Sequence, residues 1–279
     1  MASSFERNDR KGPHLGARFS PRSGARPLGK KPGAEEAGHW IWGQHAVEAV
    51  LRNPDRPMPE RLLATAVREA ALTRLRPGVA ATICDNSQIA HALPQGAAHQ
   101  GCALRTPPLE GVSLEEVSVG DYGFLLMLDQ VTDPQNVGAI LRSAAAFGAR
   151  GVIVQDRHAP PLGGALAKAA AGALEQVAVV RATNLSRALE SLSDKGWRTV
   201  GLAGEASLDL ADALDGAPTV LVLGSEGEGL RRLVAEHCDL LARIPMPGGF
   251  DSLNVSAAAA VSLYAASRTF AALPTGEQA

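Results

Sequence analysis

From Gly123 onward the chain repeats one pattern: a short, uninterrupted apolar run, followed by a segment with helical character. Runs of this kind are typical of strands buried on both faces of a parallel sheet, because helices cross over between the strands and cover each face. We therefore predict an α/β fold with a parallel sheet. The predicted strands are Gly123–Leu128, Val152–Val154, Val177–Val180, Thr199–Leu202, Thr219–Leu223 and Leu240–Ile244.

The segments between these runs carry residues that begin and end helices. Asn184 is placed to cap the start of one helix, whereas Gly148 and Gly196 are placed to end two others. The two prolines and two glycines of residues 245–249 interrupt regular structure before the last helix. The predicted helices are Asn136–Phe147, Gly163–Leu174, Asn184–Lys195, Arg231–Cys238 and Ala257–Ala271.

Residues 38–106 predict a smaller α/β domain that precedes the parallel sheet. Prolines and glycines in 107–120 predict a linker with at most one turn of helix, so the parallel-sheet domain spans 121–274. The predicted strands of the front domain are Trp40–Gly43, Arg61–Val67, Ala80–Cys84 and His99–Leu104, and its helices are Gln44–Arg52, Arg68–Leu75 and Ser87–Leu93.

Residues 1–37 predict a disordered basic tail. Residues 1–33 hold eight Lys and Arg against Glu6 and Asp9, and they contain few large aliphatic side chains. Such a segment buries too little apolar surface to offset the entropy of ordering it. Its charge suits RNA or another polyanion. The alternative is a solvated tail that only aids solubility.

Several classes of protein do not fit this composition. The net charge is −2, so no global basic field marks a nucleic-acid binder. No apolar run is long enough to span a bilayer, and no apolar core follows the early basic residues as in a secretory signal. The three cysteines match no disulfide or metal spacing. We expect a cytoplasmic protein with no metal and no membrane partner.

Ligands of parallel α/β sheets bind beyond the carboxyl ends of the strands. Three loops should therefore converge at that edge, namely residues 129–136, 224–229 and 246–254. The glycines of 224–229 let a ligand approach the backbone. However, this loop holds two glutamates and matches neither common phosphate-binding loop. We expect a neutral or cationic cofactor here.

The polar residues of these loops also have purely structural interpretations. Asn136 is placed to cap the helix that follows it, and Arg142 falls near the solvent side of that helix. The glycines of 224–229 suit a tight turn, and Ser252 and Asn254 suit the start of the last helix. Composition and spacing alone leave these alternatives open.

Three segments together resemble the motifs of one family, in the family's order. They are Asp129–Arg142 (DQVTDPQNVGAILR), Gly224–Leu230 (GSEGEGL) and Ile244–Ser256 (IPMPGGFDSLNVS). They are similar to the SpoU/TrmH family of S-adenosylmethionine-dependent RNA ribose 2′-O-methyltransferases, within the SPOUT superfamily. The subgroup that methylates guanosine in 23S rRNA resembles this chain most. Trp42–Leu51 and His99–Gly101 resemble the family's ribosomal-protein-L30e-like RNA-binding domain.

This resemblance implies a trefoil knot in the C-terminal domain, a homodimer, and S-adenosylmethionine bound near the knot. One departure is Asp251, which adds a charge near the cofactor loop. By matching motif positions, the resemblance implies the catalytic residues Asn136, Arg142, Glu226, Ser252 and Asn254. It likewise implies the cofactor-binding residues Leu223, Gly224, Gly229, Ile244, Met246, Ser252 and Leu253.

These residues suit methyl transfer to a ribose hydroxyl. Arg142 would stabilise negative charge as it develops on the oxygen, while a phosphate or water takes the proton. Asn136 and Asn254 would position the substrate or backbone, and Glu226 would orient Arg142 or its loop. Two alternatives remain open: a tRNA 2′-O-methyltransferase of the same family, and a non-catalytic RNA-binding factor of ribosome assembly.

Overall fold

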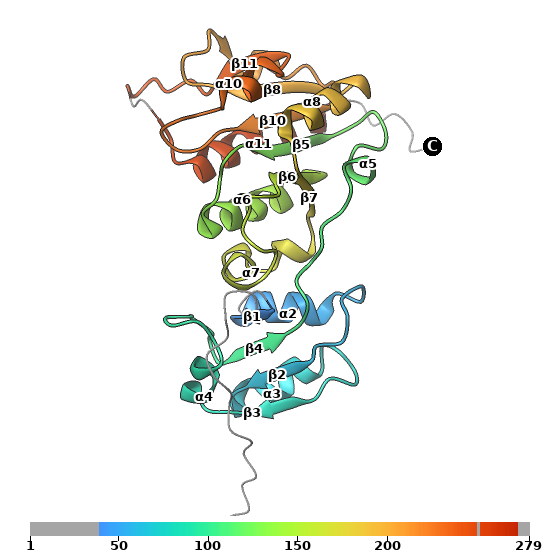
Figure 1. Ribbon diagram of the computed structural model, residues 1–279, viewed down its shortest axis with the longest axis vertical. Coiled ribbons are helices and arrows are strands. Elements are labelled where there is room, and N and C mark those ends of the chain that lie inside the picture. The colour runs from blue at the N-terminus through green and yellow to red at the C-terminus, as the bar shows by residue number, and fades with distance from the viewer. Residues whose placement is uncertain (1–38, 250–251, 273–279) are drawn as a thin grey trace, which may run out of the picture.

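The computed structural model describes residues 39–249 and 252–272, and it shows two sheets stacked along the long axis of the molecule (Figure 1). The first part of the chain forms a four-stranded sheet and the rest forms a seven-stranded sheet. The interpretations of 1–37 as a basic tail and of Asp251 as a charge near the cofactor lie outside the described residues.

The small sheet has the strand order β1-β4-β2-β3, with β1 and β2 antiparallel to β4 and β3 parallel to β2. Each strand and helix predicted for this segment is present, with ends that shift by a few residues. The strands are β1 (Trp40–Trp42), β2 (Arg61–Ala64), β3 (Ala81–Ile83) and β4 (Cys102–Arg105), and the helices are α2 (Gln44–Arg52), α3 (Ala66–Thr73) and α4 (Asn86–His91).

The segment predicted as a linker contains one short helix, α5 (Leu114–Val117). Ser113 and Glu116 form a capping box at its start, because each side chain accepts a hydrogen bond from the other residue's backbone N–H. The linker also touches the large sheet, since Val112 forms a parallel bridge with Val180. This connection is therefore held against the protein along part of its length.

The large sheet has the order β7-β6-β5-β10-β8-β11-β9, and each pairing described in it is parallel. This confirms the predicted fold class. The two-residue edge strand β9 was not predicted, because two residues carry no readable period. The strands are β5 (Phe124–Leu128), β6 (Gly151–Gln155), β7 (Ala178–Ala182), β8 (Arg198–Leu202), β9 (Leu208–Asp209), β10 (Thr219–Leu223) and β11 (Leu240–Arg243).

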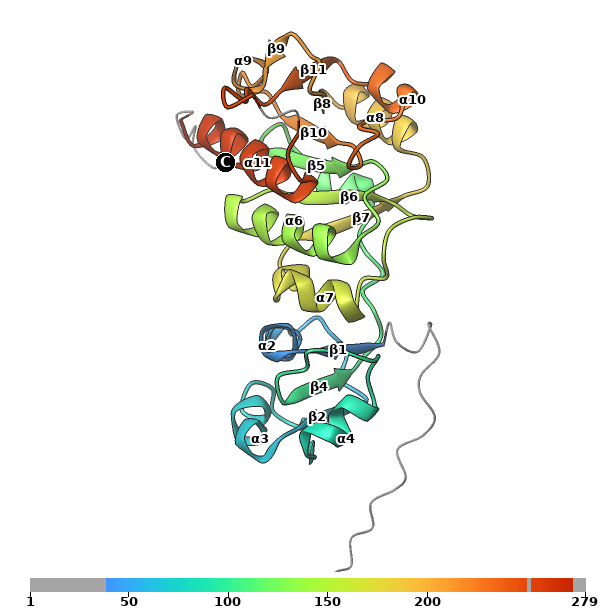
Figure 2. The same ribbon diagram turned by 90° about the vertical axis from the view of Figure 1, so that its left-hand side faces the viewer.

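Helices cover both faces of this sheet. Figure 2 shows the sheet edge-on, with α11 and α6 on one side and α8 and α10 on the other. Val137, Ile140 and Leu141 of α6 are buried in the larger core, and Leu189 of α8 is buried in a second core. The helices are α6 (Pro134–Phe147), α7 (Gly164–Ala170), α8 (Leu185–Asp194), α9 (Leu210–Ala213), α10 (Arg232–Glu236) and α11 (Val255–Ala272). Within the described part of the chain, no helix is both long and apolar enough to cross a membrane.

The prediction of one helix over Gly163–Leu174 is wrong. Helix α7 ends at Ala170, because Ala171 and Gly172 adopt positive φ angles of 49° and 97°. A short 3-10 helix, η1 (Ala173–Glu175), follows this break. A Cβ atom on Gly172 would lie 3.0 Å from the Cβ of Ala49 in α2, so tertiary packing against the front sheet outweighs helix propensity here.

A buried ion pair joins the two sheets at this break. The Nη2 atom of Arg56 lies 2.8 Å from Oε1 of Glu175, and the two side chains are only 2% and 5% exposed. Asn53 donates to the same carboxylate at 2.8 Å, and Arg56 donates to the carbonyl of Pro107 at 2.7 Å. The larger apolar core runs through this junction as well, since residues of both sheets belong to it.

We predict that Glu175→Gln lowers the free energy of unfolding by about 3 kcal/mol, because it leaves the Arg56 guanidinium buried without its carboxylate. Urea denaturation followed by circular dichroism measures this change. The matched control is Arg52→Gln, which breaks the exposed Arg52–Glu48 pair and should cost less than about 1 kcal/mol. Equal effects from both variants would show that the buried pair does not hold the sheets together.

Candidate active site

One carboxylate ties together the three loops that were predicted to converge. Oε1 of Glu226, in the Gly-rich loop of residues 224–229, accepts from Nδ2 of Asn254 at 2.5 Å and from Nδ2 of Asn136 at 3.4 Å. The two amides also meet directly, because Asn254 donates to Oδ1 of Asn136 at 3.2 Å. Residues 118 positions apart in the sequence are therefore neighbours at the carboxyl edge of the sheet.

Asn254 does two things at once because its amide has two different ends. Its Oδ1 accepts from the backbone N–H of Ser256 at 2.9 Å and from the hydroxyl of Ser256 at 2.6 Å. This caps the start of α11. Its Nδ2 is then left to donate to Glu226 and Asn136. The start of the last helix is thereby fixed to the Gly-rich loop.

The alternative that Asn136 caps α6 is wrong. Asp133 is the N-cap, and its carboxylate accepts from the backbone N–H of Gln135 at 3.1 Å. Pro134 occupies the first turn, where its missing N–H costs nothing. Because capping is done by Asp133, the amide of Asn136 is free to bond across to Glu226 and Asn254.

The Gly-rich loop closes on itself. Ser225 and Gly229 exchange backbone hydrogen bonds of 3.2 and 3.0 Å and form an isolated antiparallel bridge. A Cβ atom on Gly224 would lie only 2.0 Å from backbone atoms of Gly229. By contrast, a Cβ on Gly227 or Gly229 would meet nothing within 4 Å. The backbone is thus closely packed where Gly224 meets Gly229, whereas the space into which side chains at Gly227 and Gly229 would point is open.

A buried acidic residue, Asp129, bonds to the segment that follows the Gly-rich loop, and the sequence did not predict this contact. Asp129 follows β5 and is fully buried, and its carboxylate accepts from both the backbone N–H and the Nε of Arg231, at 2.9 and 2.8 Å. Arg231 lies directly after the loop. The available signal was a carboxylate at the end of a wholly apolar strand, since such a group needs a partner.

The other predicted site residues lie on the segments that carry Asn136, Glu226 and Asn254, or directly before them. Leu223 is buried at the end of β10, and Ile244 is half-buried directly after β11. Met246 is half-buried, whereas Ser252 and Leu253 are exposed before α11. Arg142 lies on α6 with its side chain exposed, and the structure shows no bond between it and Asn136, Glu226 or Asn254.

Cysteine and metal chemistry have no support in the described residues. Burial raises the pKa of Cys102 to about 11 and, with the nearby Asp239 charge, raises that of Cys238 to about 12. Burial also raises the pKa of Cys84. The thiolate is the nucleophilic form, so all three are protonated near neutral pH. Residues 39–249 and 252–272 hold no group of three acidic, His or Cys side chains placed to bind a metal.

The geometry suits binding and orientation of a substrate. The Gly-rich loop carries exposed carboxylates at Glu226 and Glu228, which favour a cation over a phosphate. Its open glycines let a ligand approach the backbone. Among the described residues of the three loops, no nucleophile is paired with a base, so the site suits reactions in which both reacting groups belong to bound molecules.

Comparison with known proteins gives the class and the family. Residues 123–264 match the SpoU rRNA Methylase family. A 23S rRNA (guanosine-2′-O-)-methyltransferase RlmB from Pseudomonas aeruginosa is 42% identical over 234 residues, which cover 80% of this chain and 94% of the relative. The RlmB of Escherichia coli is 39% identical over 239 residues, covering 82% of this chain and 97% of the relative.

Solved structures agree with this. The SpoU methyltransferase AviRb from Streptomyces viridochromogenes, in complex with AdoMet, aligns with a TM-score of 0.71 at 25% identity, over 84% of this chain and 90% of that one. An AdoMet-bound rRNA methyltransferase from Sinorhizobium meliloti aligns with a TM-score of 0.65 at 26% identity, over 82% and 87%. Fold and site therefore define a methyltransferase of the SPOUT class. Within that class, the chain belongs to the SpoU rRNA Methylase family, which confirms the resemblance found in its motifs.

We predict that Gly224→Ala lowers the free energy of unfolding by about 1–3 kcal/mol, because the added methyl group overlaps the backbone of Gly229. Thermal denaturation measures the loss. Gly248→Ala is the matched control: its Cβ would meet nothing within 4 Å and its φ is not positive, so stability should stay within about 0.5 kcal/mol. A Gly224→Ala variant as stable as the wild type would mean that Gly224 does not pack closely against the backbone of Gly229.

Proposed function

We propose that this enzyme transfers a methyl group from S-adenosylmethionine to the ribose 2′-hydroxyl of a guanosine in 23S rRNA. The observation that carries this proposal is the 42% identity to an enzyme of that name over 94% of its length. The junction of Asn136, Glu226 and Asn254 at one sheet edge supports it, since three of the five predicted catalytic residues meet there. The setting we propose is the cytoplasm.

The site residues fit S-adenosylmethionine. Its sulfonium is cationic, which suits a loop that presents Glu226 and Glu228 rather than basic side chains. The free space at Gly227, Gly229, Gly248 and Gly249 leaves room for a ligand against the backbone. The residues that we propose to hold it are Leu223, Gly224, Gly229, Ile244, Met246, Ser252 and Leu253.

When bound, S-adenosylmethionine supplies an electrophilic methyl group. The protein's own contribution is to hold the ribose oxygen in line with that group, since placing the two reactants accounts for much of such a rate enhancement. The new bond would join this oxygen to the methyl carbon as the bond from that carbon to sulfur breaks, S-adenosylhomocysteine would leave, and the hydroxyl proton would pass to a phosphate of the RNA or to water. Asn136, Ser252 and Asn254 orient the reacting groups.

Arg142 is the residue that we propose for stabilising the oxygen as it gains negative charge. A guanidinium remains charged at neutral pH, so it acts as an electrostatic partner and not as the base. Its side chain is exposed and pairs with no acidic group in the described part of the chain, so RNA can reach it. Glu226 holds its own loop through Asn254 and the N–H of Val255.

We further propose that 38–106 is the RNA-binding domain, that 107–120 is its linker, and that 121–274 carries the reaction. The loop before β4 extends on the same side as the carboxyl ends of β5 and β10, at the left of Figure 1. One RNA can therefore reach both. The buried Arg56–Glu175 pair holds the two parts in a fixed relation, and the tail of residues 1–37 would add non-specific charge.

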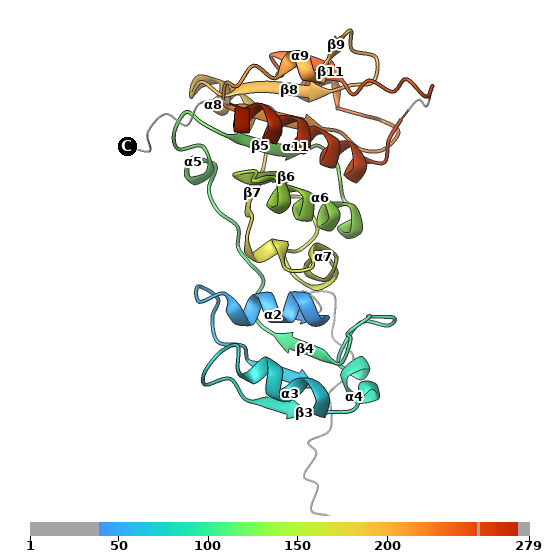
Figure 3. The ribbon, with the colours of Figure 1, turned by 180° about the vertical axis from the view of Figure 1, so that it is seen from behind.

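A homodimer is the assembly that we propose. Helix α11 is 18 residues long and contains one charged residue, Arg268. Its outward face exposes Val261 and Tyr264, which are 43% and 54% accessible, and Tyr264 stacks edge-on with Phe147 of α6. Figure 3 shows α11 and α6 side by side on this face. An apolar outer face on a long helix favours a protein partner, and a second copy fits the family.

The function is tested with purified protein, S-adenosylmethionine and a 23S rRNA transcript. The wild type should bind the cofactor in calorimetry and form 2′-O-methylguanosine. Arg142→Ala should lower the single-turnover rate about 100-fold while cofactor affinity is retained, because only charge stabilisation is lost.

Other outcomes would separate the competing functions. No heat of cofactor binding by the wild type would favour an assembly factor without catalysis. Methylation of tRNA and not of 23S rRNA would show that the substrate is a tRNA. A normal single-turnover rate in Arg142→Ala would remove Arg142 from the mechanism.

We predict that Tyr264→Glu converts the dimer to a monomer, because the substitution places a charge on the apolar face of α11. Sedimentation velocity measures the change at micromolar concentrations. Tyr264→Phe keeps the ring and serves as the matched control, so it should remain dimeric. A wild type that sediments as a monomer would contradict the proposed assembly.

A further inference from the structure

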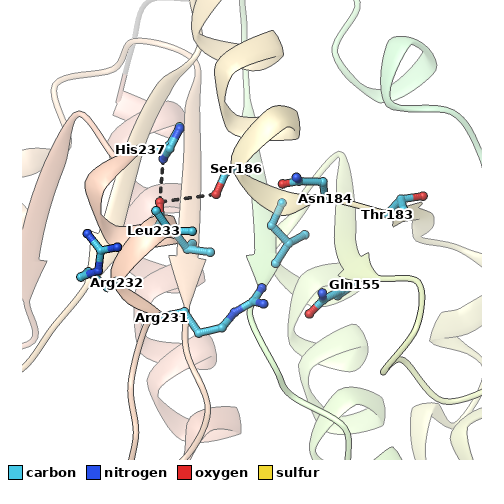
Figure 4. A pocket seen from close by; sticks show the side chains of 10 residues that line it. Gln155, Thr183, Asn184, Ser186, Arg231, Arg232, Leu233 and His237 are labelled. Atoms are coloured by element: carbon cyan, nitrogen blue, oxygen red, sulfur yellow. Dashed lines mark hydrogen bonds between the residues drawn. The ribbon is translucent and has the colours of Figure 1, made fainter.

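A pocket opens at the same edge of the sheet as the candidate active site, and none of its lining residues belongs to the catalytic or cofactor-binding sets. It is a cavity of about 490 Å³ at the carboxyl edge of the sheet, between the first turn of α8 and helix α10 (Figure 4). This volume lies in the range of small-molecule sites. Its lining includes Gln155, Thr183, Leu185, Arg231, Arg232, Leu233 and His237.

Arg231 lines this pocket and also bonds to Asp129, which begins the first of the three active-site loops. Its Nε and Nη2 atoms face Asp129, at 2.8 and 2.6 Å from Oδ1. Its side chain is 39% exposed, and Figure 4 shows it extending from the α10 side toward Gln155. One edge of the guanidinium is thus fixed by a buried carboxylate, while the side chain remains partly exposed and lines the pocket. Guanidinium planes stack on unpaired bases of RNA.

Gln155 presents an unsatisfied acceptor. It ends β6, and its Oε1 atom is buried without a hydrogen-bond partner. A buried acceptor without a donor destabilises the protein that carries it. Gln155 also lines the pocket, and a turn of its side chain that exposes this oxygen would let an N–H donor on a bound molecule satisfy it. The exocyclic amino and ring N–H groups of nucleobases are donors of this kind.

The charges of the pocket favour a base over a free phosphate. Both arginines of the pocket already have acidic partners, Arg231 with Asp129 and Arg232 with Glu236, and the ring of His237 contacts Glu190. The remaining surface is largely apolar, with Leu233 55% exposed on one wall and Leu185 lining the other. A nearly neutral pocket with apolar walls, one guanidinium plane and amide groups matches a nucleobase.

We propose that this pocket binds the base of one unpaired nucleotide of the RNA substrate, near the nucleotide that is methylated. This proposal rests on the proposed function, since it adds a contact for the same RNA. Continuity supports it: Arg231 lies two residues after Gly229, and its partner Asp129 begins the loop that leads to Asn136. The nucleotide in the pocket and the methylated nucleotide are then held by opposite sides of the same two loops.

The pocket gives the enzyme a way to select single-stranded RNA. A base in a helix is stacked and paired, so it cannot enter a cavity of this shape, whereas a base in a loop or bulge can. Selection of this kind needs no direct contact with the methylated nucleotide. It also explains why an acceptor is kept at Gln155 although it has no partner within the protein.

The test uses the full-length enzyme and a 23S rRNA transcript, with three variants. Gln155→Leu removes the acceptor, and Thr183→Trp fills the pocket from an exposed position. Arg187→Trp is the matched control, because it lies on α8 and is exposed but does not line the pocket. The measurements are KM for RNA, kcat, the affinity for S-adenosylmethionine by calorimetry, and Tm.

Both pocket variants should raise KM for RNA about tenfold and leave cofactor affinity unchanged, because one base contact is lost. Gln155→Leu should also raise Tm by about 2 °C, since the unpaired acceptor is gone; a merely structural glutamine would not combine higher Tm with weaker RNA binding. Arg187→Trp should match the wild type.

Two results would overturn the proposal. One is an unchanged KM for RNA in Gln155→Leu and Thr183→Trp, which would mean that the pocket serves another ligand, such as a free nucleotide, or none. The other is an equal rise in KM in Arg187→Trp, which would point to a general effect of changing α8. Absence of methyl transfer or of cofactor binding by the wild type would instead refute the proposed function.

Discussion

The arrangement of the candidate active site depends on the two ends of one side-chain amide. Oδ1 of Asn254 caps the last helix, and Nδ2 of Asn254 bonds to Glu226 and Asn136. Because the two ends have opposite polarity, the same residue can satisfy the backbone of α11 and fix the Gly-rich loop beside α6. Three segments that arrive from different strands are thereby held in one geometry, which positional catalysis requires.

The candidate active site is also connected to the front sheet, through the close packing of α6 against α7. A Cβ on Gly138 of α6 would lie 2.4 Å from Ala169 of α7, so glycine lets these helices approach closely. The helical conformation ends at Ala171 and Gly172, and the segment that follows places Glu175 beside Arg56. The helix that carries Asn136 and Arg142 is therefore packed against the element that holds the front sheet.

Most of the strands, and the position of the candidate site, followed from local patterns. The apolar runs marked β10 over Thr219–Leu223 without error, because a strand buried on both faces has no polar side. The three loops were placed together by the rule that parallel strands end at one edge. The break at Ala171 and Gly172 was missed because its cause is α2, which lies more than 100 residues earlier in the chain. The Asp129–Arg231 pair was missed for a similar reason, since its two members are 102 positions apart.

The sequence by itself determined the alternation of strands and helices, the order of the three polar loops, and the family to which their motifs belong. These properties are local, because each depends on residues within one turn or one strand of each other. Only the tertiary structure decided which polar groups pair: that Asp133, and not Asn136, caps α6, and that Arg231 turns one edge of its guanidinium to a buried carboxylate while it lines a neighbouring pocket. Pairing depends on distances between side chains that only the folded sheet brings together, and no spacing along the chain encodes those distances.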